Sequence, residues 1–405
     1  MSSSSGLAAP LPFYKLMALE ASELPLQMRS DGLATFKSMA RAWVPGTGNT
    51  AFGGHIYAQA AWAASKTVVE GMIIHNMTGF FVLPGRADLP FTYKVRRVRD
   101  GGIYCLRAVE VYQTLVEERS ESTTSNATKQ QTSLTEGLTE AKDMAPCFTA
   151  TVSFKRREDP GRYIHFRYQT PHVSAGHLRK TYGKVLSGRR PEDQPIAPGI
   201  DSILWTRGLE ADLWEETGLR FPGVEVRKVD MASSSTGNPD RVGEWRQLSF
   251  YRLIKDDDDD DAVDVDGDDS NTTSTLNLHA CAHLYASDRN SLFVITNALN
   301  LADQLLAPTS LSHTVIFHGD PAALSMCDRQ GRPIWFLQEA WTENGGSNRG
   351  CHESRLWRCD DDGRDEIIAT TKQDGVIRVP ADALSFEELE QQIERRRTRS
   401  GKAKL

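Results

Sequence analysis

The chain has 405 residues, of which 39% are hydrophobic and 25% charged, a composition typical of a globular protein with two or three domains. No run of about 18 apolar residues occurs, and no basic segment leads into an apolar one near the first residue. Neither a membrane span nor a secretory signal is therefore predicted. The formal net charge of -7 becomes +3 without the ten aspartates of residues 256–269, so the acidity belongs to one segment.

Several chemistries lack their sequence signatures. The six cysteines form no CxxC pair and no zinc-type spacing, which predicts reduced thiols inside a cell and no metal site. The glycine-rich signatures of phosphate and dinucleotide binding are absent, as is the G-x-S-x-G signature of serine hydrolases. Basic residues are not interleaved with aromatic ones, so no nucleic-acid partner is predicted.

The segment 51–68, AFGGHIYAQAAWAASKTV, predicts a buried helix over about 53–70, because small and apolar residues occupy nearly every side of it. Gly53 and Gly54 open this helix and leave the N–H groups of its first turn accessible. The positive end of the helix dipole lies there too, so the helix start suits a carbonyl oxygen or an anion. The alternative interpretation is a core helix preceded by an ordinary glycine turn.

Strand-like runs follow this helix and are separated by turn sequences. The first half contains strands over 75–83, 91–98, 103–116 and 147–154, and the second half over 224–229, 245–254, 311–318, 333–342, 349–358 and 366–379. A second helix-like run spans about 277–306. Each half thus combines one long helix with about five antiparallel strands, which is an α+β pattern.

This pattern divides the chain into two units, 33–157 and 222–384, joined by a linker over 158–221 that is expected to cross the surface as helix and loop. Residues 1–32 are expected to form a flexible lead. Residues 385–405 form a charged tail with little apolar surface to bury.

Two low-complexity segments interrupt the units. Residues 117–143 are rich in Ser, Thr and Glu, and residues 255–275 contain the aspartate run. Neither has enough apolar surface to order itself, and both are expected at the tips of hairpins. The aspartate run fits a solvated loop better than a calcium site, because Ala262 occupies the first ligand position of the EF-hand pattern.

Four segments together carry a family resemblance. They are AFGGHIYAQA (51–60), the run from HNMTGFFVLPG to PFTYKVRRVRDG (75–101), HLYASDRNSL (283–292), and the pair LSHTVIFH (311–318) and ATTKQDGVIRV (369–379). Through them the chain resembles the acyl-CoA thioesterase II family, including its peroxisomal eukaryotic members. The resemblance implies a double hotdog, in which each of two tandem sheets wraps one apolar helix, and it covers most of residues 33–380.

The resemblance also implies an activity, the hydrolysis of acyl-CoA to a free acid and CoA without a metal or organic cofactor. Members of the family activate a water with an Asp, a Thr or Ser, and a Gln of the second hotdog. Gln373 stands in the family's Gln position. Where the family has Asp-His-Ser/Thr, this chain has Ser312, His313 and Thr314, so Ser312 replaces the aspartate.

The family's Thr lies on the strand after a Trp. Counting from Trp335 without a gap puts Glu343 at that position, with Thr342 beside it. In double hotdogs the helix start of one half commonly faces the catalytic strands of the other half. The resemblance therefore implies a site that combines Gly53, Gly54 and His55 with Gln373, Ser312, Glu343 and Thr342.

The residues leave the general base open. An amide such as Gln373 orients water but does not accept its proton, so a carboxylate or an imidazole is required. Alternation along the strand puts Glu339 and Glu343 on one face, and Glu343 is the first candidate. His313 is the second, although its side chain should point opposite to that of Ser312. His55 is the third, because the helix dipole favours a neutral imidazole there, which could instead hydrogen-bond the thioester carbonyl.

Three functions remain open from the sequence. The first is an acyl-CoA thioesterase with an altered water network. The second is an acyl-CoA-binding double hotdog that does not hydrolyse its ligand. The third is a hotdog dehydratase or isomerase acting on an acyl thioester, with His55 or His313 as base. A tandem pair of hotdogs mimics a dimer within one chain, and further homo-oligomerisation is left open.

The sequence closes with Ala403, Lys404 and Leu405, a variant of the Ser-Lys-Leu peroxisomal signal. Arg395 to Arg397 and Lys402 precede it and are expected to keep the tail solvated. This tripeptide predicts a peroxisomal import receptor as a partner and a peroxisomal location. The alternative interpretation is a basic end to a charged helix.

Overall fold

The computed structural model describes residues 11–22, 32–45, 49–114, 144–158, 161–163, 176–186, 188–197, 221–231, 239–254, 272–289, 291–299, 301, 304–359, 365–383, 388 and 391. The insertion 117–143, most of the acidic insertion, much of the linker, and the closing tripeptide lie outside these residues. Within the described part, no helix is long and apolar enough to span a membrane.

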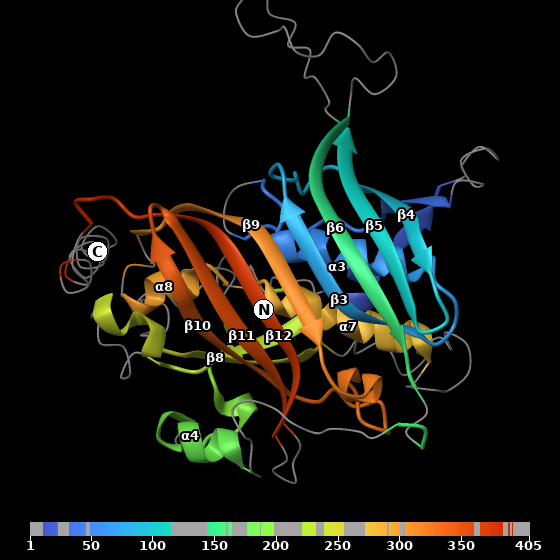
Figure 1. Cartoon of the computed structure of the whole chain (residues 1–405). Coiled ribbons are helices and arrows are strands. Elements are labelled where there is room, and N and C mark those ends of the chain that lie inside the picture. The colour runs from blue at the N-terminus through green and yellow to red at the C-terminus, as the bar shows by residue number, and fades with distance from the viewer. Residues whose placement is uncertain are drawn as a thin grey trace, which may run out of the picture.

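The described strands form one antiparallel sheet of twelve, drawn across Figure 1. Their order is β1-β2-β4-β5-β6-β3-β9-β12-β11-β10-β8-β7, so the first six strands and the last six form two halves joined where β3 pairs with β9. The first half consists of β1 (Leu19–Ala21), β2 (Leu33–Ser38), β3 (Met72–Phe81), β4 (Thr92–Asp100), β5 (Tyr104–Thr114) and β6 (Met144–Arg156). The second half consists of β7 (Val224–Lys228), β8 (Gln247–Leu253), β9 (Leu306–Phe317), β10 (Phe336–Gly346), β11 (Arg349–Cys359) and β12 (Asp365–Arg378).

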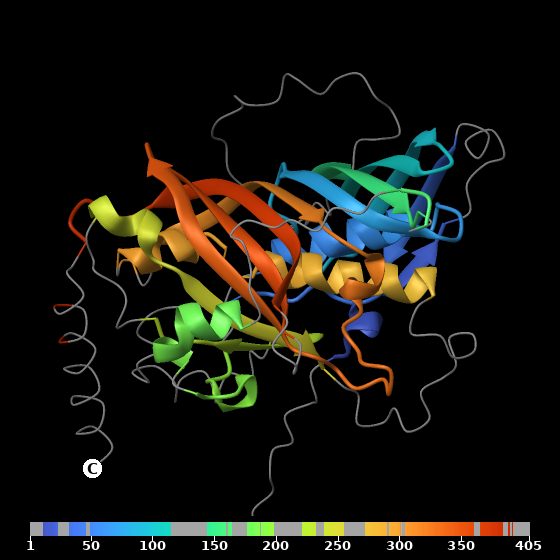
Figure 2. The same ribbon diagram turned by 60° about the horizontal axis from the view of Figure 1, so that its bottom comes forward.

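One long helix belongs to each half, α3 (Gly53–Ser65) to the first and α7 (Thr273–Ser287) to the second. Figure 2 shows the two helices side by side beneath the sheet. They run antiparallel, because Gly71, beyond the end of α3, donates its N–H to the hydroxyl of Thr273 at 2.8 Å, while the start of α3 lies against Asp288 at the end of α7. Every residue of α3 from Gly54 to Ala64 is buried. The double hotdog and its α+β class are thus confirmed.

The shorter helices are α1 (Phe13–Leu16), α4 (His177–Leu186) and α8 (Phe293–Ala298), with single 3-10 turns at Pro191–Asp193, Pro239–Glu244 and Pro321–Leu324. The expected helix over 277–306 is therefore two helices. It breaks after Ser287 at Asp288 and Arg289, since Asp, Asn and Ser hydrogen-bond locally and favour helix ends. Thr272 caps the start of α7, and its side chain accepts the N–H of Thr275 at 3.2 Å.

The lead differs from the expectation of a flexible segment, because residues 11–22 contain α1 and β1. Phe13, Leu16 and Met17 are buried in the main core. Gln59 of α3 also donates to the carbonyl of Leu16 at 3.4 Å. The acidic insertion differs as well, since the residues before it end β8 and those after it begin α7, so it does not connect a hairpin.

Linker helix α4 lies on the face of β10 and β11 opposite to α7. Gln338 points toward α7 and donates to the carbonyl of Ser287 at 3.1 Å, so by alternation Leu337 and Glu339 point the other way. There Leu337 shares a second apolar cluster with Leu178 of α4. The sheet of the second half is thus covered on both faces.

Candidate active site

Asp288 lies where the end of α7 meets the start of α3. A Cβ on Gly54 would stand 2.9 Å from the Cβ of Asp288 and 2.5 Å from the ring of Phe52, and one on Gly53 would stand 3.1 Å from Oδ2 of Asp288. The glycine pair thus admits the carboxylate to the first turn of α3, where the N–H of Gly54 hydrogen-bonds to it. The sequence predicted that this helix start binds a carbonyl or an anion, and in the structure an anionic side chain of the chain itself lies there.

Gln373 on β12 connects this carboxylate to a hydroxyl. Its Nε2 donates to Oδ1 of Asp288 at 2.6 Å and to Oγ of Ser310 at 2.7 Å. Both amide hydrogens are therefore used, and the serine hydroxyl is left with its own hydrogen to donate. The three side chains form a polar cluster against the first turn of α3.

Ser310 reaches the cluster because strand β9 is bulged. His313 pairs with Gln373 and Ser312 with Asp374, but Ser310 pairs with Gly375, so Leu311 is an extra residue. Regular alternation from His313 would have put Ser310 on the opposite face. The bulge returns it to the face of Gln373.

Burial raises the pKa of Asp288 to about 7, although the hydrogen bonds from Gln373 and Gly54 oppose the rise. His313 lies beside it, with its Nδ1 3.8 Å from Oδ1 of Asp288. Burial lowers the pKa of His313 to about 3, so its ring is neutral near pH 7 and does not form a charged pair with the carboxylate. The carboxylate is thus available as a base that titrates near neutral pH.

A row of buried polar residues crosses the inner face of the sheet on either side of Gln373. In register from β10 to β9 it consists of Thr342, His352, Gln373 and His313. Nε2 of His352 lies 3.4 Å from Oε1 of Gln373. The ring of Tyr57 on α3 stacks on His313 with centroids 4.6 Å apart. Thr342, a predicted site residue, therefore belongs to the same row as Gln373 but stands two strands away from it.

His55 is fully buried in the first turn of α3. Neither ring nitrogen has a hydrogen-bond partner among the residues that the structure describes. Burial lowers the pKa of His55 to about 4, and the side chain of Gln59 on the same helix partly opposes this shift. The expected neutral imidazole is present, and its main cause is burial of the ring.

Two predicted site positions differ from the expectation. Ser312 does not lie beside Gln373, because it faces the other side of the sheet and donates to Asp374, which also pairs with Arg349. Glu343 occupies a bulge between Thr342 and Asn344 and is exposed. Neither can supply the missing acid of the family pattern in this geometry.

Glu339 is buried but faces linker helix α4. It accepts hydrogen bonds from the hydroxyl of Tyr182 and from Nε1 of Trp357, the latter at 3.0 Å. The guanidinium groups of Arg355 and Arg246 lie 3.6 and 3.9 Å from its oxygens. This carboxylate fastens the linker to the sheet and lies on the face away from Gln373.

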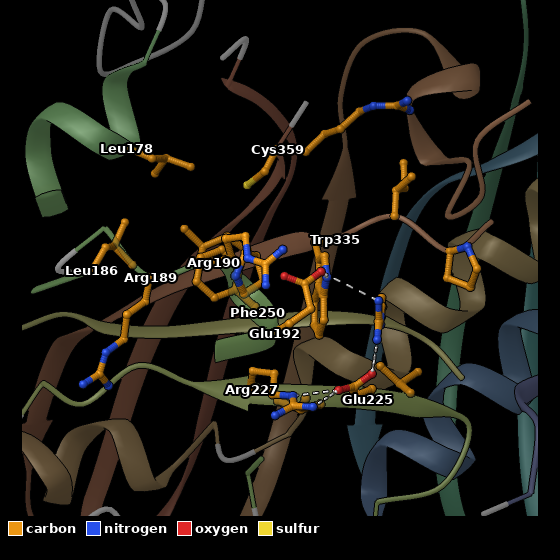
Figure 3. Close-up of a pocket in the computed structure, with 18 of the residues that line it drawn as sticks. Leu178, Leu186, Arg189, Arg190, Glu192, Glu225, Arg227, Phe250, Trp335 and Cys359 are labelled. Carbon is orange, nitrogen blue, oxygen red and sulfur yellow. Dashed lines mark hydrogen bonds and ion pairs between the residues drawn. The ribbon is translucent and has the colours of Figure 1, made fainter. Parts of the chain in front are cut away.

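A large groove lies beside the linker, and Figure 3 shows it. Leu178 and Leu186 of α4 line one side, and Trp335, which also lines the groove, donates from Nε1 to Glu192 at 2.6 Å. Arg227 and Glu225 pair along the strand below. None of Asp288, Ser310 and Gln373 is among the residues that line it. The groove is thus separate from the polar cluster.

Asp288 and Ser310 are the two members of the cluster that the sequence did not identify. Asp288 lies within HLYASDRNSL, a segment that carried the family resemblance, and an acid placed directly after an apolar helix was a usable signal. Ser310 gave no comparable signal, because the bulge that turns it inward leaves no mark in the alternation. Across the described residues, no group of three or more His, Cys, Asp or Glu side chains is placed to hold a metal ion.

The chain is similar in sequence to known acyl-CoA thioesterases. A family model described as the acyl-CoA thioesterase N-terminal domain matches residues 40–155. Acyl-coenzyme A thioesterase 8 of Rattus norvegicus is 41% identical over 337 residues, which are 83% of this chain and 82% of that protein. Acyl-coenzyme A thioesterase 8 of Homo sapiens is 23% identical over 338 residues with the same coverage of both chains.

Two solved structures share the fold. An acyl-CoA thioesterase II, TesB2, from Mycobacterium marinum superposes with a TM-score of 0.50 and 18% identity, over 92% of this chain and 99% of that one. A hot dog protein of unknown function from Alicyclobacillus acidocaldarius gives a TM-score of 0.50 and 15% identity, over 91% of this chain and 98% of that one.

Proposed function

We propose that this chain, which belongs to the acyl-CoA thioesterase II family, hydrolyses acyl-CoA to CoA and a free carboxylic acid at the cluster of Asp288, Gln373 and Ser310. The observation that carries the proposal is the double hydrogen bond from Gln373 Nε2 to the carboxylate and the hydroxyl. These two hydrogen bonds hold the carboxylate of Asp288 and the hydroxyl of Ser310 in fixed positions. Thioester hydrolysis requires two such groups, one to accept a proton from the attacking water and one to orient it.

In the proposed reaction a water donates one hydrogen to Asp288 and is oriented by the hydroxyl of Ser310. Asp288 takes the proton as the water oxygen bonds to the thioester carbon. The carbon–sulfur bond then breaks, and the proton passes from Asp288 to the departing CoA thiolate, which returns the carboxylate to its starting state. The pKa of about 7 suits both halves of this cycle, since the group must accept and release one proton near neutral pH.

The start of α3 supports the same reaction. N–H groups of a first helical turn and a water-excluded setting stabilise negative charge on a carbonyl oxygen. The Gly54 N–H already hydrogen-bonds to Asp288, so the thioester oxygen would take another donor, and the unpartnered ring of His55 lies in the same turn of the described helix. Gly53, Gly54 and His55 remain the proposed substrate-binding residues.

Purified protein with acyl-CoAs of short, medium, long and aromatic acyl chains tests the proposal through a thiol-detecting reagent. Wild-type protein is expected to release CoA from at least one of them. Gln373→Leu should lose most of the activity, because Asp288 and Ser310 lose their common donor. Ser312→Ala is the matched control, since that serine lies on the same strand as Ser310 but faces away, and its activity should match wild type. Acyl-CoA binding without CoA release, or an acyl thioester product that survives, would overturn the proposal.

A peroxisomal location is a second part of the proposal. It is carried by the tripeptide Ala403, Lys404 and Leu405, which lies outside the described residues. The chain with a fluorescent protein fused before residue 1 should co-localise with a peroxisomal marker. The same fusion without residues 403–405 should spread through the cell, and unchanged peroxisomal fluorescence would contradict the import signal.

A further inference from the structure

Gln373 must be held in one of two amide orientations for the cluster to form. An amide side chain presents a donor on one side and an acceptor on the other, and rotation by half a turn exchanges them. In the observed orientation Nε2 points toward Asp288 and Ser310. In the reversed one, Oε1 would face the carboxylate and repel it.

His352 on β11 is the neighbour that distinguishes the two orientations. Its Nε2 lies 3.4 Å from Oε1 of Gln373, and the two residues are directly paired across β11 and β12. Both side chains are fully buried, so water does not compete for the amide oxygen. An Nε2–H on this ring favours the acceptor side of the amide and disfavours the donor side.

The tautomer of His352 needs a cause of its own, because a neutral imidazole carries its hydrogen on either nitrogen. Nδ1 of His352 has no hydrogen-bond partner among the described residues. Oε1 of Gln373 can only accept a hydrogen bond, so its contact with Nε2 of His352 requires the ring hydrogen on that nitrogen.

We propose that His352 is a positioning residue for hydrolysis, which holds the amide of Gln373 in the orientation that donates to Asp288. This inference rests on the proposed function. His352 acts through Gln373 and does not touch the substrate.

The proposal predicts a change in the titration of Asp288. Its surroundings contain Gln373 on β12, His313 on β9, Tyr57 on α3 and Arg289 next to it in the chain, with His352 on β11 beyond Gln373. His313 and His352 have pKa values of about 3 and about 4 and keep their charge state between pH 5 and 9. Loss of the Gln373 hydrogen bond would raise the pKa of Asp288 above about 7.

The experiment compares His352→Leu, which removes the ring nitrogens, with His352→Gln, which keeps an N–H donor. In His352→Leu, kcat should fall about tenfold with KM nearly unchanged, and the acidic limb of the pH–rate profile should move up by about one pH unit. His352→Gln should recover much of kcat and return the limb toward its wild-type position.

Two further measurements separate the possible failures. His283→Gln is the matched control, because His283 is an equally buried histidine on α7 whose ring contacts Tyr251 and Leu324 rather than the cluster. It is expected to lower the unfolding temperature without moving the pH limb. In the substrate-free protein, unfolding free energies measured from pH 5 to 9 report the titration of Asp288 independently of turnover.

If wild type is inactive, the proposed function fails, whereas the unfolding data still test the role of His352. If wild type is active and His352→Leu keeps its kcat and its pH limb, the inference is wrong. The same conclusion follows if His352→Leu and His352→Gln lose kcat equally with no movement of the limb, because that result indicates a structural role only.

Discussion

In each half of the chain, the first turn of one long helix faces a carboxylate that follows the other helix. At one junction the start of α3 meets Asp288, and at the other the start of α7 meets Glu70. Glu70 is exposed and accepts hydrogen bonds from the N–H and hydroxyl of Thr273. Asp288 is 6% exposed and is bound by Gln373 and the Gly54 N–H. The same architecture thus gives an ordinary helix cap at one end and a base that titrates near neutral pH at the other.

The difference comes from the strands and from the first residues of each helix. Thr272 caps the start of α7 with its own side-chain oxygen, which accepts the N–H of Thr275. Gly53 and Gly54 supply none, and the space they leave admits a carboxylate from the other half. Burial then determines the chemistry, because a carboxylate out of water holds its proton more tightly.

The largest expected effect comes from exchanging the two carboxylates for amides. Asp288→Asn should lower kcat/KM by about a thousandfold, since an amide cannot accept the proton from water. Glu70→Gln should stay within about twofold of wild type, because it alters only an exposed cap. Thiol release from the best acyl-CoA substrate measures both. Comparable losses in the two variants would show that the two junctions are not functionally distinct.

The next effect separates the two faces of β9. Ser310→Ala removes the hydroxyl that Gln373 binds and should lower kcat by about tenfold. The backbone bulge of β9 should remain, because the substitution changes only the side chain. Ser312→Ala removes a hydroxyl bound to Asp374 on the outer face and should leave kcat unchanged. Steady-state kinetics on the two variants decide whether the bulge positions a functional group. Equal kcat values for both variants would remove Ser310 from the site.

The pH dependence sharpens the comparison further. With a pKa of about 7, Asp288 is mostly protonated at pH 6 and mostly ionised at pH 8. Activity should therefore rise by about tenfold between these pH values, because only the ionised form accepts a proton. His313, His352 and His55, with pKa values of about 3 to about 4, stay neutral over this range and add no limb. A profile that is flat from pH 5 to 9 would exclude Asp288 as the base.

Much of the fold follows from local pattern. The helix at 53–65 can be predicted because apolar residues occupy nearly every side of it. Most strands can be predicted because apolar and polar residues alternate along them. The site is visible only in part. Gln373 and the glycine pair were identified, whereas Ser310 depends on a one-residue bulge and Asp288 on the antiparallel packing of α3 and α7. The positions of Ser310 and Asp288 thus depend on contacts between segments that are distant in the sequence. The residue pattern of one strand or helix does not predict such contacts.

The position of Glu339 makes the same point. Glu339 and Leu337 lie on one face of β10, as alternation along a strand requires, but the sequence could not show that linker helix α4 covers that face. A carboxylate that was a candidate base is therefore held by Tyr182 and Trp357 on the far side of the sheet. The alternation shows which residues of β10 share a face, but it does not show which of the two faces points toward Gln373.

The smallest expected effect concerns stability and runs opposite to the effect on activity. The pKa of Asp288 is raised in the folded chain, from an ordinary value near 4 to about 7, so the folded state holds a proton that the unfolded state releases. The stability that this proton contributes is present below about pH 4 and is lost as the pH rises through about 7. Asp288→Asn stays neutral at every pH. It should unfold with a free energy about 1–2 kcal/mol above that of wild type at pH 8, and with no such advantage at pH 4.

Urea unfolding at pH 4 and pH 8 measures this difference, with Glu70→Gln as the control at the exposed junction. That variant should differ little from wild type at either pH, since its carboxylate is solvated when ionised. If Asp288→Asn is inactive and is more stable than wild type only at high pH, the buried carboxylate lowers the free energy of unfolding when it is ionised. A variant that is less stable at both pH values would instead indicate that the carboxylate acts mainly as a structural link between α3 and α7.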